Sequence, residues 1–138
     1  MLRYMLDTNV CIHAMRHPDS GIADHFKANA AEMCISTISL HELLYGVEKS
    51  PRPDYHRQLT MDMVSRLEIL DFDAAAADHA GDIRADLAKS GALLGAYDML
   101  IAGHARSLGL TIVTHNVREF SRVKALLWED WQTKERQS

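Results

Sequence analysis

The sequence is short of cysteine and of long apolar runs, and each shortage excludes a class of protein. Two cysteines, Cys11 and Cys34, in 138 residues cannot form a disulfide framework, and neither has the spacing of a metal-binding pair. We expect both to be buried, reduced thiols. No apolar run approaches the roughly 20 residues that span a bilayer, and the acid at position 7 comes too early for a secretion signal. These absences predict a soluble, cytoplasmic protein with no membrane part.

Basic residues are also in the minority. Fifteen Lys and Arg against nineteen Asp and Glu leave a formal net charge of −4 at pH 7. Broad, non-specific nucleic-acid binding rests on a basic face that neutralises phosphates, and this balance argues against it. The content of 47% hydrophobic and 25% charged residues is that of an ordinary folded protein. The length predicts a single domain over residues 1–138.

Short apolar segments alternate with longer amphipathic ones, which predicts strands separated by helices. The expected strands are residues 2–6, 33–36, 68–72 and 111–114, with an edge strand around 126–128. The expected helices run from position 8 to about 15, over 20–31, from 39 onward, and over 55–67, 74–89 and 97–108. This alternation indicates an α/β sandwich in which helices flank a mostly parallel central sheet.

Acids and amides follow several of the expected strands. Asp7 directly follows the first strand, Asn116 lies two residues after the strand at 111–114, and Glu119 comes three residues later. Asp98 begins a helix with no obvious strand before it. Ligands of parallel sheets bind beyond the carboxyl ends of the strands. Carboxylates from separate loops suit Mg²⁺, and paired ions of this kind activate water for phosphodiester cleavage. The placement therefore favours a metal site at this edge.

Each acid also has a structural explanation that the sequence leaves open. Asp7 is able to cap the first helix, although the next two residues are equally good capping types. Asp98 suits the positive end of a helix dipole. Glu42 lies opposite the apolar stripe of residues 40–47 on a helical wheel, so periodicity favours a solvated glutamate.

The histidines and arginines show no recognisable pattern. His104 and His115 lack the spacing of metal ligands, and we assign His13, His17 and His25 to no common helical face. Surface or hydrogen-bonded histidines are the expectation for all eight. Four arginines either rim a phosphate-bearing cleft or are simply solvated: Arg84, Arg106, Arg118 and Arg122.

Four motifs together resemble the VapC-type PIN-domain endoribonucleases, the toxin components of type II toxin–antitoxin pairs. In chain order they are Met5-Leu6-Asp7-Thr8-Asn9, Ile38-Ser39-Leu40-His41-Glu42-Leu43, Asp98-Met99-Leu100-Ile101-Ala102 and Thr114-His115-Asn116-Val117-Arg118-Glu119-Phe120. The similarity extends over nearly the whole chain. It implies a PIN-like α/β/α sandwich with an acidic, Mg²⁺-dependent site that cuts RNA, Mn²⁺ being an alternative ion.

Carried over position by position, the resemblance implies a catalytic cluster of four carboxylates. They are Asp7, Glu42, Asp98 and Glu119. Asp7 and Asp98 would be the principal metal ligands, and Glu42 would complete the metal site directly or through water. The metal would activate a water that attacks the phosphate in line and leaves a 5′-phosphate and a 3′-hydroxyl.

Three polar residues would orient this cluster. Thr8 and Asn9 would hold Asp7 or a water by hydrogen bonds. Asn116 stands where many relatives have an aspartate, so Glu119, one helical turn further on, is a candidate for the fourth position.

The resemblance also implies partners: an RNA substrate, with tRNA favoured, a VapB-type antitoxin whose Arg or Lys fills the acidic cleft, and a second copy in a homodimer. The segment 51–67, with Met61 and Met63, either packs in the core or forms a binding surface. A catalytically silent PIN-like module that binds RNA or protein is the alternative, and the amide at Asn116 is its support. A phosphohydrolase with a nucleophilic aspartate fits less well, because it needs a second acid where Asn9 stands.

Overall fold

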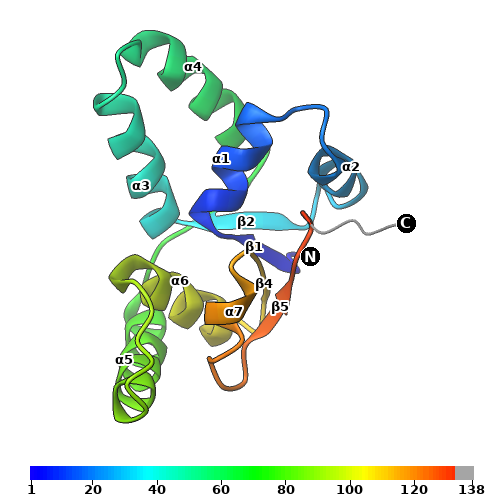
Figure 1. Ribbon diagram of the computed structural model, residues 1–138. Helices are drawn as coiled ribbons and strands as arrows, with labels where there is room; N and C mark the ends of the chain where they lie inside the picture. The colour runs from blue at the N-terminus through cyan, green and yellow to red at the C-terminus, as the bar shows by residue number, and fades with distance from the viewer. Residues whose placement is uncertain (133–138) are drawn as a thin grey trace.

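A five-stranded parallel sheet forms the centre of the structure, a computed structural model that describes residues 1–132 (Figure 1). The strands are β1 (Tyr4–Leu6), β2 (Met33–Ser36), β3 (Glu68–Leu70), β4 (Thr111–Val113) and β5 (Leu127–Glu129). Their order is β3-β2-β1-β4-β5, and every neighbouring pair is parallel. The α/β prediction is confirmed, and the sheet is wholly rather than mostly parallel.

Two layers of helices cover the sheet (Figure 1). One layer contains α1 (Thr8–Arg16), α2 (Gly21–Ala28), α3 (Thr37–Glu48) and α4 (Pro53–Val64). The other contains α5 (Ala74–Lys89), α6 (Ala96–Ser107) and the short α7 (Val117–Phe120). Within residues 1–132, no helix combines the length and apolarity needed to cross a bilayer.

Most predicted elements are confirmed to within a few residues, and the differences have local causes. Helix α3 begins at Thr37, before the expected position 39, because the Ser36 hydroxyl caps it by accepting from the Ile38 N–H at 3.1 Å. Helix α4 begins at Pro53, which needs no N–H partner in a first turn. Helix α7 was not predicted, since four residues carry no helical periodicity.

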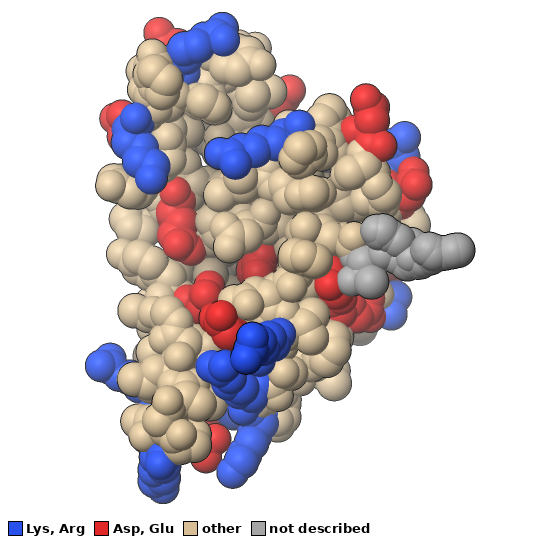
Figure 2. Space-filling model, in the orientation of Figure 1, with Lys and Arg blue, Asp and Glu red and all other residues tan. Residues whose placement is uncertain are grey.

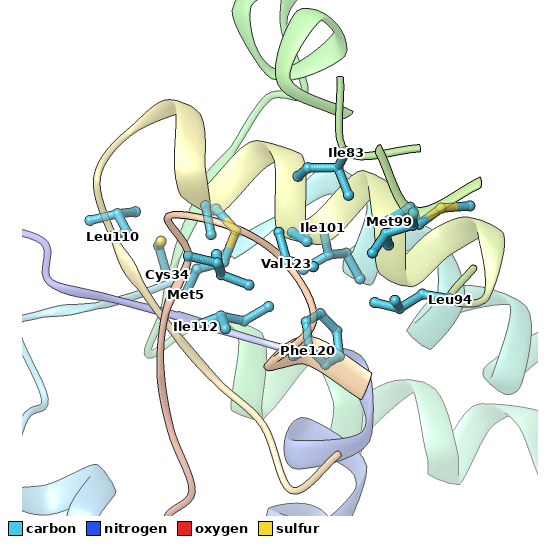
Figure 3. Close-up of a cluster of buried hydrophobic side chains, with 14 residues drawn as sticks. Met5, Cys34, Ile83, Leu94, Met99, Ile101, Leu110, Ile112, Phe120 and Val123 are labelled. Atoms are coloured by element: carbon cyan, nitrogen blue, oxygen red, sulfur yellow. The ribbon is translucent and has the colours of Figure 1, made fainter. Parts of the chain in front are cut away.

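Alternate residues of the central strands feed two separate cores. On β1 and β4, Met5 and Ile112 pack toward α5, α6 and α7, where they meet Ile101 and Phe120 (Figure 3). Leu6 and its neighbours on the other face pack against α1 to α4. A strand that is buried on both faces has apolar side chains at successive positions. This is why the central strands appear in the sequence as short, continuous hydrophobic segments. The free thiols Cys11 and Cys34 are buried here, as expected.

The strand order places a topological switch between β1 and β4. The chain moves outward from β1 through β2 to β3, and then returns to pair β4 with the opposite side of β1. Connections leave these two strands in opposite directions, which opens a crevice beyond their carboxyl ends. Asp7 follows β1 and Thr114 follows β4, so both lie at this crevice.

Helices α5 and α6 pack closely against each other. A Cβ added at Gly103 would lie 2.6 Å from the Cα of Ala80, so only glycine permits this approach. The pair is held to the sheet by Ile83 and Ile101, which belong to the core of Figure 3. This packing fixes the N-terminal end of α6, where Asp98 lies.

Candidate active site

Asp7 is buried at the switch point, with only 3% of its surface exposed. It is the N-cap of α1, and its Oδ1 accepts from the Val10 N–H at 2.8 Å. Thr114 donates a side-chain hydrogen bond to the same carboxylate. Burial raises the pKa of Asp7, and these two donors oppose the rise. Asp7 therefore both caps α1 and belongs to the candidate site.

The segment after β4 supports Asp7 and places a second carboxylate. The Thr114 hydroxyl accepts from the backbone N–H of Asn116 at 2.9 Å. The Asn116 side-chain amide in turn donates to Oε2 of Glu119 at 3.0 Å. Asn116 thus holds Glu119 by its side chain, while its part in the reaction stays a prediction.

Glu42 comes to the site from the middle of α3. Its Oε1 accepts a 2.6 Å hydrogen bond from the Thr8 hydroxyl. The side chain is half-buried rather than solvated, so the interpretation from helical periodicity was wrong for this residue. Thr8 was expected to hold Asp7 or a water, and the hydrogen bond that its hydroxyl donates here goes to Glu42.

Asp98 completes the group from the first turn of α6. Burial first, and then the negative charges of neighbouring carboxylates, raise the pKa of Asp98 to about 6. Those neighbours are Asp7, Glu42 and Glu119. The other three predicted carboxylates are therefore all within electrostatic reach of Asp98, although the four come from separate segments.

The charge of this cluster suits a divalent cation. In the part of the chain that the structure describes, none of the four carboxylates forms a salt bridge with Lys or Arg. Figure 2 shows acidic side chains gathered around a hollow in the middle of this face, with basic side chains above and below. Hard oxygen donors with uncompensated charge are the ligands that Mg²⁺ and Mn²⁺ prefer.

The carboxylates do not form a ready-made metal cage. Within residues 1–132, no group of three or more His, Cys, Asp and Glu side chains has the arrangement of a metal-binding set. Mg²⁺ keeps several of its waters and takes few protein ligands, so it does not depend on a cage of this kind.

A pocket opens on the α1 side of Asp7. It has a volume of about 380 Å³ and is lined by side chains that include Asn9, His13, His17 and Asn116. The rings of His13 and His17 lie one helical turn apart, with centroids 4.6 Å from each other. These histidines were expected to share no helical face; His17 is the C-cap of α1 rather than part of the helix, yet its ring lies against that of His13.

The remaining predicted residues lie outside the cluster. His104 is buried and hydrogen-bonded to Ser36 at 2.8 Å, as expected of a core histidine. Arg106 forms a 2.6 Å salt bridge with Asp82 and is not free to rim a cleft. Met63 packs against the core, whereas Met61 is exposed.

Sequence reasoning missed Thr114 as a site residue. Its side chain is fully buried and connects Asp7 to Asn116. Threonine is common in β-strands, so residue type alone does not distinguish Thr114 from the strand residues before it. Its position directly after a strand that pairs with β1 was the available signal.

Together, the fold and the site define an α/β protein with four carboxylates at the carboxyl edge of a parallel sheet. The sequence matches the PIN domain family over residues 4–126. The tRNA(fMet)-specific endonuclease VapC of Shigella flexneri is 50% identical over 131 residues, which is 95% of this chain and 99% of that protein.

Solved structures give the same result. The DNA-bound VapBC of Salmonella typhimurium superposes with a TM-score of 0.92 at 49% identity, covering 95% of this chain and 99% of that one. VapBC2 of Rickettsia felis, bound to a promoter DNA fragment, has a TM-score of 0.89 at 38% identity, covering 94% and 99%. The chain belongs to the PIN-domain family, in its VapC ribonuclease branch.

Proposed function

We propose that the chain is a Mg²⁺-dependent endoribonuclease, and that it is the toxin of a type II toxin–antitoxin pair. The observation that carries the proposal is the uncompensated carboxylate cluster, in which burial and like charges raise the pKa of Asp98 to about 6. A divalent cation relieves that repulsion, and a phosphodiester is the substrate that such a site handles.

The proposed role of each residue follows from its position in the site. Asp7 and Asp98 are the principal metal ligands, and Glu42 completes the metal site directly or through water. Thr8 orients Glu42 through its 2.6 Å hydrogen bond. Bound Mg²⁺ supplies activation of water and stabilisation of the leaving oxygen.

Two side chains beside Asp7 complete the assignment. Glu119, held by Asn116, takes the fourth acidic position. Asn9 is exposed at the pocket and orients a water there.

The substrate we favour is initiator tRNA. The relative from Shigella flexneri, similar over nearly its whole length, is named as specific for tRNA(fMet). The acidic balance of the chain agrees with selective rather than broad RNA binding, since the bound metal and not a basic face makes the cleft acceptable to phosphate.

The partners follow from the same relatives. Their solved structures are VapBC complexes, and this supports a VapB-type antitoxin that silences the present chain. An antitoxin Arg or Lys placed among the four carboxylates would form charge-assisted hydrogen bonds and compete with the metal. We further propose a homodimer of single-domain chains, acting in the cytoplasm where tRNA is found, with no membrane association.

The test is cleavage by the purified chain, freed of antitoxin. Initiator tRNA and total RNA are incubated with Mg²⁺, with EDTA, and with the Asp7→Asn variant. We expect discrete fragments with 5′-phosphate and 3′-hydroxyl ends in Mg²⁺ alone. A 2′,3′-cyclic phosphate would contradict hydrolysis by water. RNA that stays intact in every sample would favour the catalytically silent module instead.

A further inference from the structure

The pocket beside Asp7 has a basic and aromatic wall that the carboxylate chemistry does not use. Three imidazoles and one guanidinium line it: His13, His17, His115 and Arg16. Asp7 also lines it, and so belongs both to this pocket and to the carboxylate cluster. Whatever occupies the pocket is therefore in direct reach of the reacting phosphate.

Helix α1 builds most of this wall with one face. Asn9, His13, Arg16 and His17 are spaced at i, i+4, i+7 and i+8, which places them along the same side of the helix. The opposite side, with Cys11, is buried in the core. The helix is therefore fixed by its apolar face while it presents a row of nitrogen-bearing side chains to the pocket.

The guanidinium of this wall is available to a ligand. Within the described residues, the guanidinium of Arg16 has no hydrogen bond or salt bridge, in contrast to Arg3, Arg57 and Arg106. The rings of His13 and His17 lie against each other at 4.6 Å. The third ring, from the segment after β4, has its His115 Nδ1 3.1 Å from an oxygen of Asp130, which holds that ring in place.

We propose that this pocket binds one nucleotide of single-stranded RNA next to the scissile phosphate, with its phosphate on Arg16 and His13 and its base against the imidazole rings. The inference rests on the ribonuclease function proposed above and adds the subsite that positions the strand. Arg16 and His13 act as positioning residues here, since the carboxylates carry the chemistry.

Size and chemistry both favour this occupant. A volume of about 380 Å³ falls at the lower end of small-ligand sites, which suits a single nucleotide. Arginine presents a planar fork that matches phosphate oxygens, and rings stack on the faces of unpaired bases. A base inside a duplex cannot turn into such a pocket, so the strand here must be single-stranded.

The basic end of α1 has a competing explanation. His13 and Arg16 lie in the last turn, where cations stabilise the helix dipole. That role alone would make their replacement lower the stability of the protein and leave RNA affinity unchanged. The experiment must therefore measure RNA contacts directly.

Binding is measured in an Asp98→Asn host, which is expected not to cut RNA, and Asp98 does not line the pocket. The probe is a fluorescein-labelled RNA hairpin with a single-stranded loop, followed by fluorescence anisotropy in Mg²⁺. We expect Arg16→Gln to raise the Kd about tenfold and His13→Gln to raise it about threefold. Loss of one phosphate contact should also reduce the slope of log K against log salt by about 0.7.

Arg66→Gln is the matched control. Arg66 is exposed and lies just before β3, at the amino edge of the sheet, opposite the site. We expect its Kd and salt slope to equal those of the host. An Arg16→Gln Kd within twofold of the host, or a raised Kd with an unchanged salt slope, overturns the subsite.

Cleavage kinetics of a chain that carries Arg16→Gln as its only substitution provide a second test of the subsite. We expect Arg16→Gln to raise KM for the RNA about tenfold and to change kcat by less than about threefold. The lost contact would bind the RNA equally well in the ground state and in the transition state, so its loss weakens binding without slowing the chemical step. A fall in kcat at constant KM contradicts a positioning role. If the unaltered chain leaves RNA intact, the ribonuclease proposal fails, while the anisotropy measurement still decides the subsite.

Discussion

The Thr8 hydroxyl donates a 2.6 Å hydrogen bond to Oε1 of Glu42, and this bond joins α1 to α3 across 34 positions of sequence. It holds a carboxylate that helical periodicity assigns to solvent. Thr8 itself is buried and follows directly after the capping Asp7. The first turn of α1 therefore places two of the four acids, one as its cap and one through a hydroxyl.

Replacement of Thr8 by valine should slow RNA cleavage while the fold is kept. Valine has the same shape and lacks the hydroxyl, so Glu42 loses its 2.6 Å donor. A hydrogen bond to a charged group is worth about 1.5–3 kcal/mol, which sets the loss in rate at about 10- to 100-fold. Single-turnover cleavage at saturating Mg²⁺ measures it. Thr8→Ser keeps the hydroxyl and should stay within about threefold of the unaltered chain; equal rates for all three proteins would contradict the assignment.

Asp98→Asn should abolish cleavage and, without metal, leave the chain at least as stable. The aspartate is partly buried beside three other carboxylates, so its negative charge destabilises the metal-free fold. Thermal unfolding is compared in EDTA and in excess Mg²⁺. The unaltered chain should gain stability with Mg²⁺ by mass action, and the variant should gain less. An equal gain in both would mean that Asp98 is not a ligand.

The stability of the metal-free protein should fall as the pH rises from about 4 to about 6. Folding raises the pKa of Asp98 from 3.8 to about 6, so in this range the folded chain holds a proton that the unfolded chain has lost. The slope of the free energy of unfolding against pH is then negative, with a total change of about 1 kcal/mol after allowance for solvent screening. Urea unfolding in EDTA measures it. Asp98→Asn should flatten the slope, and an unchanged slope would assign the effect to other groups.

Two glycines in the α5–α6 pair should respond to alanine in opposite directions. At Gly103 the new Cβ would lie 2.6 Å from backbone atoms of Ala80, so Gly103→Ala should lower the free energy of unfolding by about 2 kcal/mol. It should also shift α6 and slow cleavage through Asp98. Gly81 lies on α5 with open space around its Cα, so Gly81→Ala should stabilise by about 0.5–1 kcal/mol through helix propensity. Urea unfolding of both variants measures the difference, and the same sign for both would show that the close approach is not limiting.

The sequence predicted the fold well because its strands are short apolar runs between amphipathic helices. Helix α5 was expected at its observed bounds, and β5 was expected within a few residues as an edge strand. Periodicity is a local property, so it predicts an element without knowledge of its neighbours. It fails where the element is too short for a period, as in α7.

Local sequence patterns predicted only part of the candidate site. Asp7 was found from its place after the first strand. Glu42 required the resemblance to a family, because its helix shows only that it lies away from the apolar stripe. Thr114 and the pairing of His13 with His17 were missed, since their meaning depends on which strand and which pocket lie beside them.

By itself, the sequence determined the alternation of strands and helices and the acidic balance, both of which are written in residue type and spacing, while the choice of the four carboxylates also needed the resemblance to a family. The tertiary structure decided what those carboxylates do to one another. Parallel pairing of β1 with β4 brings Thr114 to Asp7, and the close packing of α6 on α5 at Gly103 fixes the helix that carries Asp98. Charges that are distant in sequence repel in the fold, because burial removes the water that would screen them.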